Sequence, residues 1–416
     1  MAVFIAIAIS AHAQAPAATS AAPAAGGPGP GRNPDAGQAG NLTRSPEVGD
    51  DRKITFRLQA PNARAVQVFG DFTKDLAGVE MTKDDNGVWS FTTEALKPSY
   101  YQYWFVMDGL KMPDPLNTFV RPASGVYKSQ VAVPGPEAEF MTFRDVPHGN
   151  LTEHLYLNQE NKTSRRVVIY TPPDYNHSGK DYPVLYLLHG ANDFERGWTQ
   201  AGMANLIMDN LIADGKAIPA IIVMPFGHDT TGASGKQPEI KALQASLGYV
   251  APARGPRGTP GAAPGAVPAS RSGPNYMEKD LLGNVLPYVE KEFRVLKDKE
   301  HRAIFGYSMG GGQSTTIGFG HPELFAYVAG FSGYAGATSP TITTLLADPA
   351  KTNKDYKIIF IGSGAEDPAV NGGRTLHAAF AEKGIHHIWS EDPGYHHDYQ
   401  IWRIYLHTLL QKTFRD

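Results

Sequence analysis

The sequence predicts an α/β domain with a mostly parallel sheet and helices on both faces, preceded by a small all-β, immunoglobulin-like sandwich. Short strand-like segments without helical periodicity fill residues 54–106, which indicates the sandwich. Farther along the chain, apolar strand-like runs alternate with helical stretches, which indicates parallel β-α-β units. The chain of 416 residues is long enough for two such domains and their tails.

The composition of the chain excludes several classes of function. A formal net charge of −3 gives no electrostatic reason to expect nucleic acid or a membrane as a partner. The absence of cysteine excludes a thiol nucleophile, a thiolate metal site and disulfide bonds. The sequence also lacks a His-Glu-x-x-His motif and the glycine-rich phosphate loops, so we expect no metal and no cofactor.

The N-terminal segment predicts an export signal and a linker. Residues 2–9 are apolar, and Ala11-His12-Ala13 has the pattern of a signal-peptidase site. We therefore expect a signal peptide over 1–13 and a secreted or periplasmic protein. The apolar run is too short to span a bilayer, and it lacks the basic residues that usually open a signal peptide. Residues 14–45, rich in Ala, Pro and Gly, are predicted to be a disordered linker.

The sandwich is predicted over residues 46–135. Residues 54–59 alternate apolar and polar side chains, as a half-buried strand does. Asn86-Gly87 is a strong hairpin-turn signal ahead of another strand, and residues 100–106 carry aromatic side chains on both faces. The predicted strands are residues 54–59, 66–69, 88–91 and 100–106.

A linker over 136–149 leads to the α/β domain, which is predicted over 150–416. Residues 276–293 carry apolar side chains at helical spacing. A long insertion at 229–275 shows no strand and no strong helix; we interpret it as a mobile surface insertion, with a substrate-contacting lid as the alternative. The predicted strands, apolar as in a sheet covered on both faces, are residues 167–170, 184–188, 220–224 and 357–361.

Gly306-Tyr307-Ser308-Met309-Gly310 is the most informative motif of the chain. An apolar run at 302–305 precedes it and a glycine-rich, helix-like segment follows it, which is the context of a nucleophile elbow. The glycines permit a tight turn, because a Cβ beside the turn would clash. We therefore predict an α/β-hydrolase fold in which Ser308 is the nucleophile and the Met309 N–H points at a developing oxyanion.

A serine nucleophile needs a base and an orienting carboxylate, which follow it in the order Asp or Glu, then His, in this fold. Asp367 comes just after a predicted strand, with Glu366 as the adjacent competitor. His396 and His397 follow a strand predicted over 385–389 and precede a C-terminal helix. From these residues alone, either histidine can be the base.

A second oxyanion donor is expected in the loop after the strand at 184–188. His189-Gly190-Ala191-Asn192 follows that strand directly, and Gly190 lets the backbone turn so that an N–H points into the site. Together with the Met309 N–H, this loop supplies two donors. His189 itself is expected to hold the loop.

Residues 150–416 resemble carbohydrate esterase family 1, the esterase D-like group of α/β-hydrolases that includes feruloyl and acetyl xylan esterases. The matching stretches are 182–190, 302–311 and the motif His397-Asp398-x-x-x-Trp402-Arg403. The resemblance implies His397 as the base, because the family's histidine lies five residues before the Trp of a Trp-Arg pair. It also implies Asp367 as the carboxylate and Ala191 and Met309 as the oxyanion donors. The 229–275 insertion departs from the compact family pattern.

Residues 46–135 resemble the E-set, CBM48-like sandwich that precedes such esterases. Gly70-Asp71-Phe72 and the stretches at 60–63 and 81–89 carry this likeness. Four aromatic residues are candidates for stacking on sugars, although aromatic side chains in strands usually belong to the core, and the core interpretation is preferred. These residues are Trp89, Tyr101, Tyr103 and Trp104.

The resemblance implies a secreted serine esterase that removes feruloyl or acetyl groups from plant cell-wall polysaccharide such as arabinoxylan, through an acyl-enzyme on Ser308. Its expected partner is an ester-substituted polysaccharide or oligosaccharide. A siderophore esterase of the enterochelin type and a non-catalytic glycan-binding scaffold are the alternatives, and the intact Ser, Asp and His set argues against the scaffold. The sequence predicts neither the acyl group nor the oligomeric state.

Overall fold

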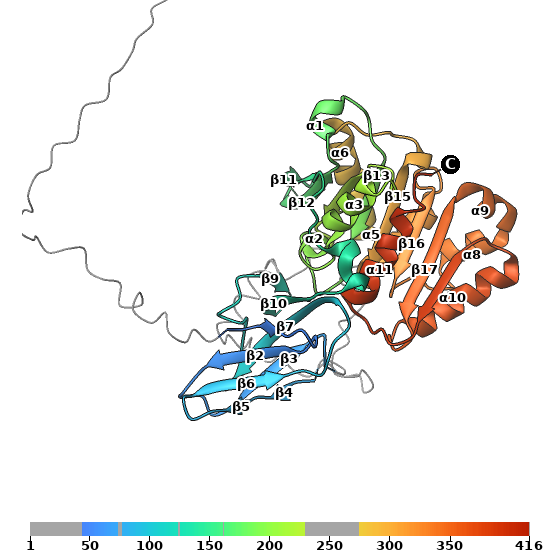
Figure 1. Cartoon of the computed structure of the whole chain (residues 1–416). Coiled ribbons are helices and arrows are strands. Elements are labelled where there is room, and N and C mark those ends of the chain that lie inside the picture. The colour runs from blue at the N-terminus through green and yellow to red at the C-terminus, as the bar shows by residue number, and fades with distance from the viewer. Residues whose placement is uncertain (1–43, 74–76, 124, 161, 229–273, 416) are drawn as a thin grey trace, which may run out of the picture. The chain divides into compact units, whose positions relative to one another are not determined.

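The computed structural model describes residues 44–73, 77–123, 125–160, 162–228 and 274–415 (Figure 1). The predicted signal peptide, nearly all of the predicted linker and nearly all of the 229–275 insertion lie outside these residues. Within them, the chain forms an all-β sandwich followed by an α/β domain, which confirms the predicted fold class.

The sandwich consists of two antiparallel sheets. The four strands expected from the sequence are present as β2 (Ile54–Gln59), β3 (Val66–Gly70), β6 (Val88–Thr92) and β7 (Ser99–Met107), and six further strands complete the two sheets within the described residues. One sheet has the order β1 (Glu47–Val48), β2 (Ile54–Gln59), β6 (Val88–Thr92) and β5 (Thr82–Lys83). The other has the order β4 (Val79–Glu80), β3 (Val66–Gly70), β7 (Ser99–Met107), β10 (Val126–Val133) and β9 (Val120–Ala123), with β8 (Leu110–Met112) paired to β7.

The aromatic residues of the sandwich are buried. Tyr101 and Tyr103 on one face of β7 are 3% and 0% exposed and belong to the sandwich core together with Trp89. Trp104 lies on the opposite face of β7, where it is 8% exposed and stacks on Phe69. The core interpretation is therefore confirmed for Trp89, Tyr101 and Tyr103. Neither these three residues nor Trp104 presents an exposed ring on which a sugar could stack.

The α/β domain is built on an eight-stranded sheet, reached through the short helix η3 (Pro136–Met141). The pairings of β11 with β12 and of β12 with β14 are antiparallel, and the other five are parallel. The strand order is β11 (Asn150–Leu157), β12 (Ser164–Thr171), β14 (Ile221–Pro225), β13 (Val184–Leu188), β15 (Arg302–Tyr307), β16 (Tyr327–Phe331), β17 (Ile358–Gly364) and β18 (Ile388–Asp392).

Helices cover both faces of this sheet, so each central strand buries alternate side chains in two separate cores. In β13, for example, Leu185 and Leu187 belong to one core and Val184, Tyr186 and Leu188 to the other. The first core is closed by α3 (Ala204–Ala213) and α11 (Tyr399–Leu410). The second is closed by α5 (Pro274–Asp280), α6 (Leu286–Glu292), α7 (Met309–Gly320), α8 (Pro340–Ala347) and α10 (Val370–Lys383).

Shorter helices complete the domain. The helix expected over 276–293 runs through α5, a π-helical turn, η4 (Leu281–Val285), and α6. This turn ends two residues before Pro287, which has no N–H to continue the regular hydrogen-bond ladder. The other short helices are α1 (Tyr175–Ser178), α2 (Gly197–Gln200), η5 (Lys299–His301) and α9 (Pro349–Asp355).

Two strand boundaries differ from the prediction. The strand expected over 385–389 is present as β18, but it begins at Ile388 and ends at Asp392, three residues later than predicted at each end. Ile385 instead ends the helix cap: Gly384 adopts a left-handed conformation with φ 68°, and the Ile385 N–H donates to Phe380 O at 2.9 Å. The strand expected to end at Ile361 continues to Gly364, so that Asp367 lies three residues beyond it.

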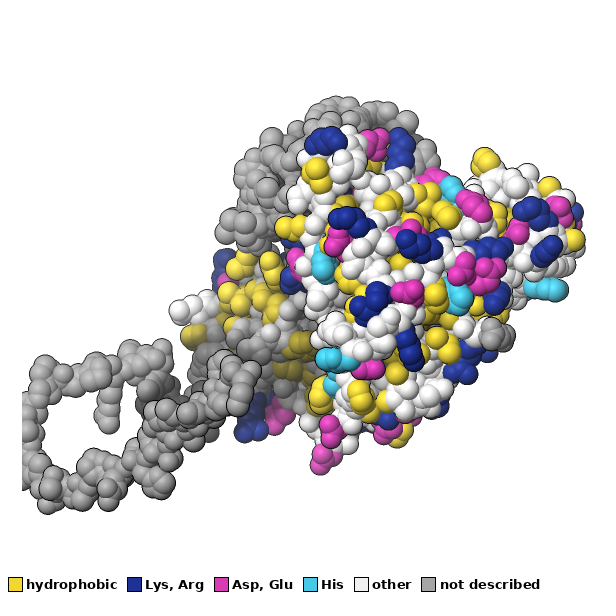
Figure 2. All heavy atoms as spheres, turned by 90° about the horizontal axis from the view of Figure 1, so that it is seen from above, with side chains coloured by type: hydrophobic (Ala, Val, Ile, Leu, Met, Phe, Trp, Pro, Cys, Tyr) yellow, Lys and Arg dark blue, Asp and Glu magenta, His cyan; other side chains and the backbone are white. Residues whose placement is uncertain are grey.

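The surface of the described residues carries mixed charge. On the face shown in Figure 2, basic and acidic side chains are interspersed and do not gather by sign. No helix among the described residues combines the length and the apolar character that crossing a membrane requires.

Candidate active site

Ser308 lies in a sharp turn between β15 and α7. Its φ of 54° and ψ of −119° are unusual for a non-glycine residue and cost about 1–3 kcal/mol, which the surrounding structure must offset. The Ser308 N–H donates to Phe331 O of the neighbouring strand at 2.8 Å. A Cβ on Gly306 would lie only 2.4 Å from Gly310 O, so glycine is what lets strand and helix meet at this turn.

The structure brings Ser308, His397 and Asp367 together in one hydrogen-bonded chain. His397 Nε2 lies 2.9 Å from Ser308 Oγ, and His397 Nδ1 lies 3.0 Å from each carboxylate oxygen of Asp367. The competitors line the same cavity but are not members of this hydrogen-bonded chain: the Gly394 N–H donates to Glu366 at 2.9 Å, and the His396 side chain is exposed.

Asp367 is held as an ionised, buried carboxylate. It is 1% exposed and also accepts the Ala369 N–H at 2.7 Å. Burial by itself raises the pKa of Asp367, but the hydrogen bonds and charge of His397 outweigh burial, so the pKa lies below its ordinary value. A carboxylate on Nδ1 fixes the imidazole orientation with Nε2 toward Ser308.

The loop that carries His397 rests on the first turn of α11. Asp398 caps this helix by accepting the Gln400 N–H at 2.8 Å. Trp402, one turn farther, stands perpendicular to the His397 ring at 5.1 Å and stacks on Tyr307 at 4.0 Å. The nucleophile turn and the His397 loop therefore share one aromatic support.

Ala191 and Met309, the expected oxyanion donors, lie on neighbouring segments. Strands β13 and β15 are parallel, with Leu188 opposite Gly306, so the loop after β13 starts beside the Ser308 turn. A Cβ on Gly190 would lie 3.2 Å from Ser308 Cβ. Met309 is the first residue of α7, where backbone N–H groups have no acceptor within the helix.

His189 holds the loop after β13, as expected from the sequence. The buried ring lies with Nδ1 2.8 Å from Gly190 O, and its Nε2 accepts the Gly227 N–H at 2.9 Å. Burial, assisted by the neighbouring His228, lowers the pKa of His189 to about 3. The imidazole is therefore neutral at physiological pH. It holds the loop through one nitrogen that donates a hydrogen bond and one that accepts a hydrogen bond.

A cavity of about 460 Å³ opens above Ser308, and both domains line it. Burial lowers the pKa of Lys128, whose Nζ lies 5.1 Å from the Trp104 ring centroid. Burial, with Asp71 as a second cause, raises the pKa of Asp398. The sandwich contributes Asp71, Thr73, Gln102, Arg121 and Lys128 to the lining, and the α/β domain contributes Ala191, Asn192, Ser308, Glu366, His396, His397 and Asp398 among others.

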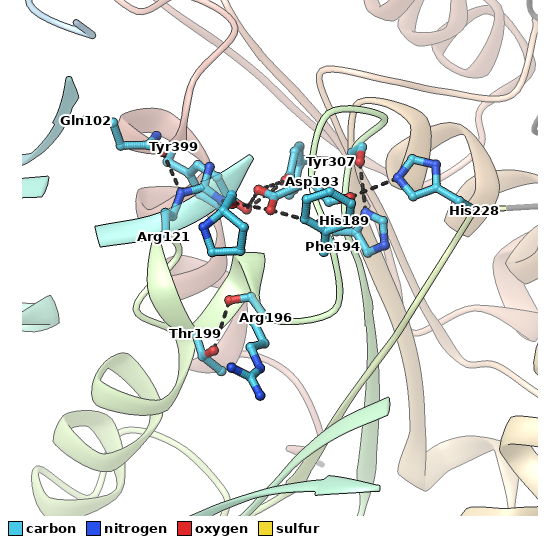
Figure 3. A network of polar contacts seen from close by, with 12 residues as sticks. Gln102, Arg121, His189, Asp193, Phe194, Arg196, Thr199, His228, Tyr307 and Tyr399 are labelled. Atoms are coloured by element: carbon cyan, nitrogen blue, oxygen red, sulfur yellow. Dashed lines mark hydrogen bonds and ion pairs between the residues drawn. The ribbon is translucent and has the colours of Figure 1, made fainter. Parts of the chain in front are cut away.

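Sequence reasoning missed a buried network around Asp193 (Figure 3). Its carboxylate pairs with Arg121 at 2.8 Å and accepts hydrogen bonds from the hydroxyls of Tyr307 and Tyr399. An acidic residue directly after the His189-Gly190 loop was the one available signal. Arg121 lies 72 residues away in the sandwich and carries no local signal.

Within the described ranges, His, Cys, Asp and Glu side chains form no group of three or more that could hold a metal ion.

The strained serine turn, the hydrogen-bonded histidine and the buried aspartate define an α/β-hydrolase with a Ser-His-Asp constellation. Comparison of the sequence with protein families agrees with this class. The chain belongs to the family described as putative esterase, whose profile matches residues 159–246 and 254–412. Residues 42–117 match carbohydrate-binding module 48, the isoamylase N-terminal domain.

Two curated relatives are similar to this chain in sequence. The endo-1,4-beta-xylanase/feruloyl esterase of Xylanibacter ruminicola is 29% identical over 380 residues, which are 89% of this chain and 46% of that protein. An esterase of Mycobacterium tuberculosis is 28% identical over 217 residues, 51% of this chain and 36% of that protein. The chain thus spans less than half the length of these relatives.

Solved structures share the fold. The enterochelin esterase of Shigella flexneri aligns with a TM-score of 0.59 and 18% identity over 89% of this chain and 94% of its own. The CE1 ferulic acid esterase of Anaeromyces mucronatus, in complex with ferulic acid, aligns with a TM-score of 0.50 and 20% identity over 72% of this chain and 97% of its own.

Proposed function

We propose that the chain is a serine carboxylic ester hydrolase that removes feruloyl or acetyl groups from ester-substituted plant polysaccharide. The observation that carries the proposal is the hydrogen-bonded chain from Ser308 through His397 to the buried Asp367, with Ser308 and His397 lining an open cavity. The name of the Xylanibacter relative, which includes feruloyl esterase, supports the feruloyl group.

In the acylation half, Ser308 Oγ attacks the ester carbonyl carbon while His397 Nε2 takes the hydroxyl proton. Asp367 stabilises the imidazolium that forms. The oxyanion of the tetrahedral intermediate accepts hydrogen bonds from the N–H groups of Ala191 and Met309. The intermediate then collapses, its C–O bond to the sugar breaks, and His397 protonates the departing sugar oxygen.

In the deacylation half, His397 takes a proton from water, and the resulting hydroxide attacks the acyl carbon on Ser308. The second tetrahedral intermediate occupies the same oxyanion donors. Its collapse releases the carboxylic acid and returns the proton from His397 to Ser308 Oγ. Each proton that leaves a nucleophile thus reaches a leaving group through one imidazole.

A siderophore esterase of the enterochelin type is the second candidate. It is favoured by the Shigella enterochelin esterase, whose shared fold covers both domains of this chain. The lining of the cavity opposes it: among the described residues, Arg121 and Asp193 neutralise each other, and the remaining carboxylates, Asp71, Glu366 and Asp398, outnumber the one remaining cation, Lys128. A ferric catecholate is strongly anionic and would meet like charge there, whereas the hydroxyls of a neutral sugar can donate to the same oxygens.

The test compares hydrolysis of methyl ferulate and of acetylated xylan by the purified protein, with Ser308→Ala as the control. Ferulate release that disappears in the variant supports a feruloyl esterase, and acetate release alone supports an acetyl xylan esterase. If the protein hydrolyses neither substrate, the polysaccharide proposal is contradicted. Hydrolysis of ferric enterochelin in that case would establish the second candidate.

We propose further that the protein is exported. The apolar segment and the Ala11-His12-Ala13 sequence support cleavage before Gln14. Intact-mass measurement on protein recovered from the periplasm or medium tests this: a mature chain that begins at Gln14 is expected, and retention of residues 1–13 would contradict it.

A further inference from the structure

Arg121 crosses from the sandwich into the α/β domain and forms a buried ion pair there. Its side chain is 4% exposed, and its Nη1 lies 2.8 Å from Oδ1 of Asp193, which is equally buried. On the sandwich side, Arg121 Nε donates to Gln102 Oε1 at 2.7 Å. Gln102 is in turn fixed by Asp71, which accepts its backbone N–H at 3.0 Å. The guanidinium is thus held rigidly by its own domain.

Asp193 connects this arginine to three segments of the proposed catalytic site (Figure 3). It stands two residues after Ala191, in the loop of one oxyanion donor. Its Oδ2 accepts the hydroxyl of Tyr307, the residue before Ser308, at 2.8 Å. The same oxygen accepts the hydroxyl of Tyr399, two residues after His397, at 2.7 Å. The two tyrosine oxygens lie 2.7 Å apart.

The charge of Arg121 favours the ionised form of Asp193. Burial raises the pKa of Asp193, and Arg121 is the largest of the opposing causes, so the pKa of the carboxyl lies below its ordinary value. A buried carboxylate that loses its cation becomes protonated or draws in water. Either change weakens its hold on the two hydroxyls, and with it the mutual placement of Ser308, His397 and Ala191.

We propose that Arg121 is a positioning residue for ester hydrolysis. Through it, the sandwich fixes the positions of the segments that carry Ala191, Ser308 and His397 relative to one another. This proposal rests on the proposed function of the Ser308 site. It predicts that loss of Arg121 lowers turnover even of an ester as small as p-nitrophenyl acetate, because Arg121 acts through Asp193.

The experiment measures two rates in the full chain: turnover of p-nitrophenyl acetate, and phosphonylation of Ser308 by a fluorophosphonate, which needs no particular acyl group. For Arg121→Met we expect kcat and the phosphonylation rate to fall about 10- to 100-fold, with KM within about twofold, because the reacting groups are displaced while the acyl pocket stays. Arg121→Lys, which keeps the cation, is expected to recover most of both rates.

Arg302→Met is the matched control. Arg302 is also buried and pairs with Glu290 at 2.7 Å, but it begins β15 at the end opposite to Ser308. We expect this variant to lose thermal stability as Arg121→Met does, while the rates of its folded fraction stay at the wild-type value. A general structural effect would lower the rates of both variants alike and would overturn the proposal.

Tyr399→Phe keeps the proposal testable if Arg121→Met does not fold. It removes one hydroxyl from Asp193 while the ring stays packed on Trp402, and a smaller drop in kcat at unchanged KM is expected. Wild-type rates in every folded variant of Arg121 and Tyr399 would overturn the proposal. Failure of the wild type to release ferulate or acetate would contradict the substrate proposal alone, because the phosphonylation rates report on the site without it.

Discussion

Replacing Gly310 by Ala tests whether the Ser308 turn needs direct backbone contact with the loop after β13, which carries the proposed oxyanion donor Ala191. Gly310 is the second residue of α7, and a Cβ there would lie 2.6 Å from the carbonyl oxygens of both Leu188 and His189. These are backbone atoms, so no side chain can rotate away. Restoring an ordinary 3.4 Å contact requires helix and loop to separate by about 0.8 Å.

Two losses follow from that separation. Overpacking of this kind costs about 1–3 kcal/mol of stability. Moving the Met309 N–H relative to Ala191 by nearly 1 Å is expected to lower kcat about 100-fold, because catalytic groups tolerate little misplacement. Gly312→Ala is the control in the same helix: the nearest atom to its Cβ is Tyr334 O at 3.8 Å, and Ala gains about 0.5–1 kcal/mol over Gly in a helix.

Urea unfolding and initial rates on p-nitrophenyl acetate measure both quantities for the two variants. We expect Gly310→Ala to be less stable and much less active than the wild type. Gly312→Ala is expected to be slightly more stable and fully active. If Gly310→Ala matches Gly312→Ala in stability and in kcat, close backbone approach is not what the glycine provides, and the reasoning is refuted.

Three further outcomes are expected. Asp367→Asn should lower kcat by about 10⁴ at neutral pH without unfolding the protein, because the imidazole loses its orienting carboxylate; circular dichroism alongside kinetics checks both parts. His396→Ala should change kcat less than threefold, and a loss as large as that of His397→Ala would reverse the assignment of the base. Stability should fall on acidification below pH 6.5: unfolded histidine binds a proton near pH 6.5, but folded His189 does so only near pH 3. His189 therefore contributes up to about 1.4 kcal/mol per pH unit to the slope of the unfolding free energy against pH. Unfolding curves measured between pH 4 and 6.5 should lose this contribution in His189→Gln. An unchanged slope would contradict the assignment.

The juxtaposition of the three side chains of the proposed reaction centre was predictable because each lies in a short motif at a strand end. The Ser308 turn is marked by its glycines and flanking apolar run, and the structure places Asp367 and His397 beside it. The choice of His397 over His396 came from a family resemblance, since both residues occupy the same loop and only three-dimensional contacts separate them.

What the sequence did not predict depends on contacts between distant residues. Arg121 and Asp193 are 72 residues apart and belong to different domains, so no local pattern connects them. The strand near the C-terminus was placed too early because Ile385 is apolar for another reason: it caps α10 after Gly384. An apolar side chain at a helix end and one at a strand start look alike in sequence.

The buried pair of Arg121 and Asp193 also bears on how two-domain proteins of this kind diverge. Because the cation and the carboxylate stand on different domains, neither can be lost by itself without stranding the other's charge inside the protein. A recombination event that exchanges the sandwich must supply an equivalent arginine or remove the acid at the same step. We therefore expect a chimera that joins this α/β domain to a foreign sandwich to keep its stability only if it meets the same requirement.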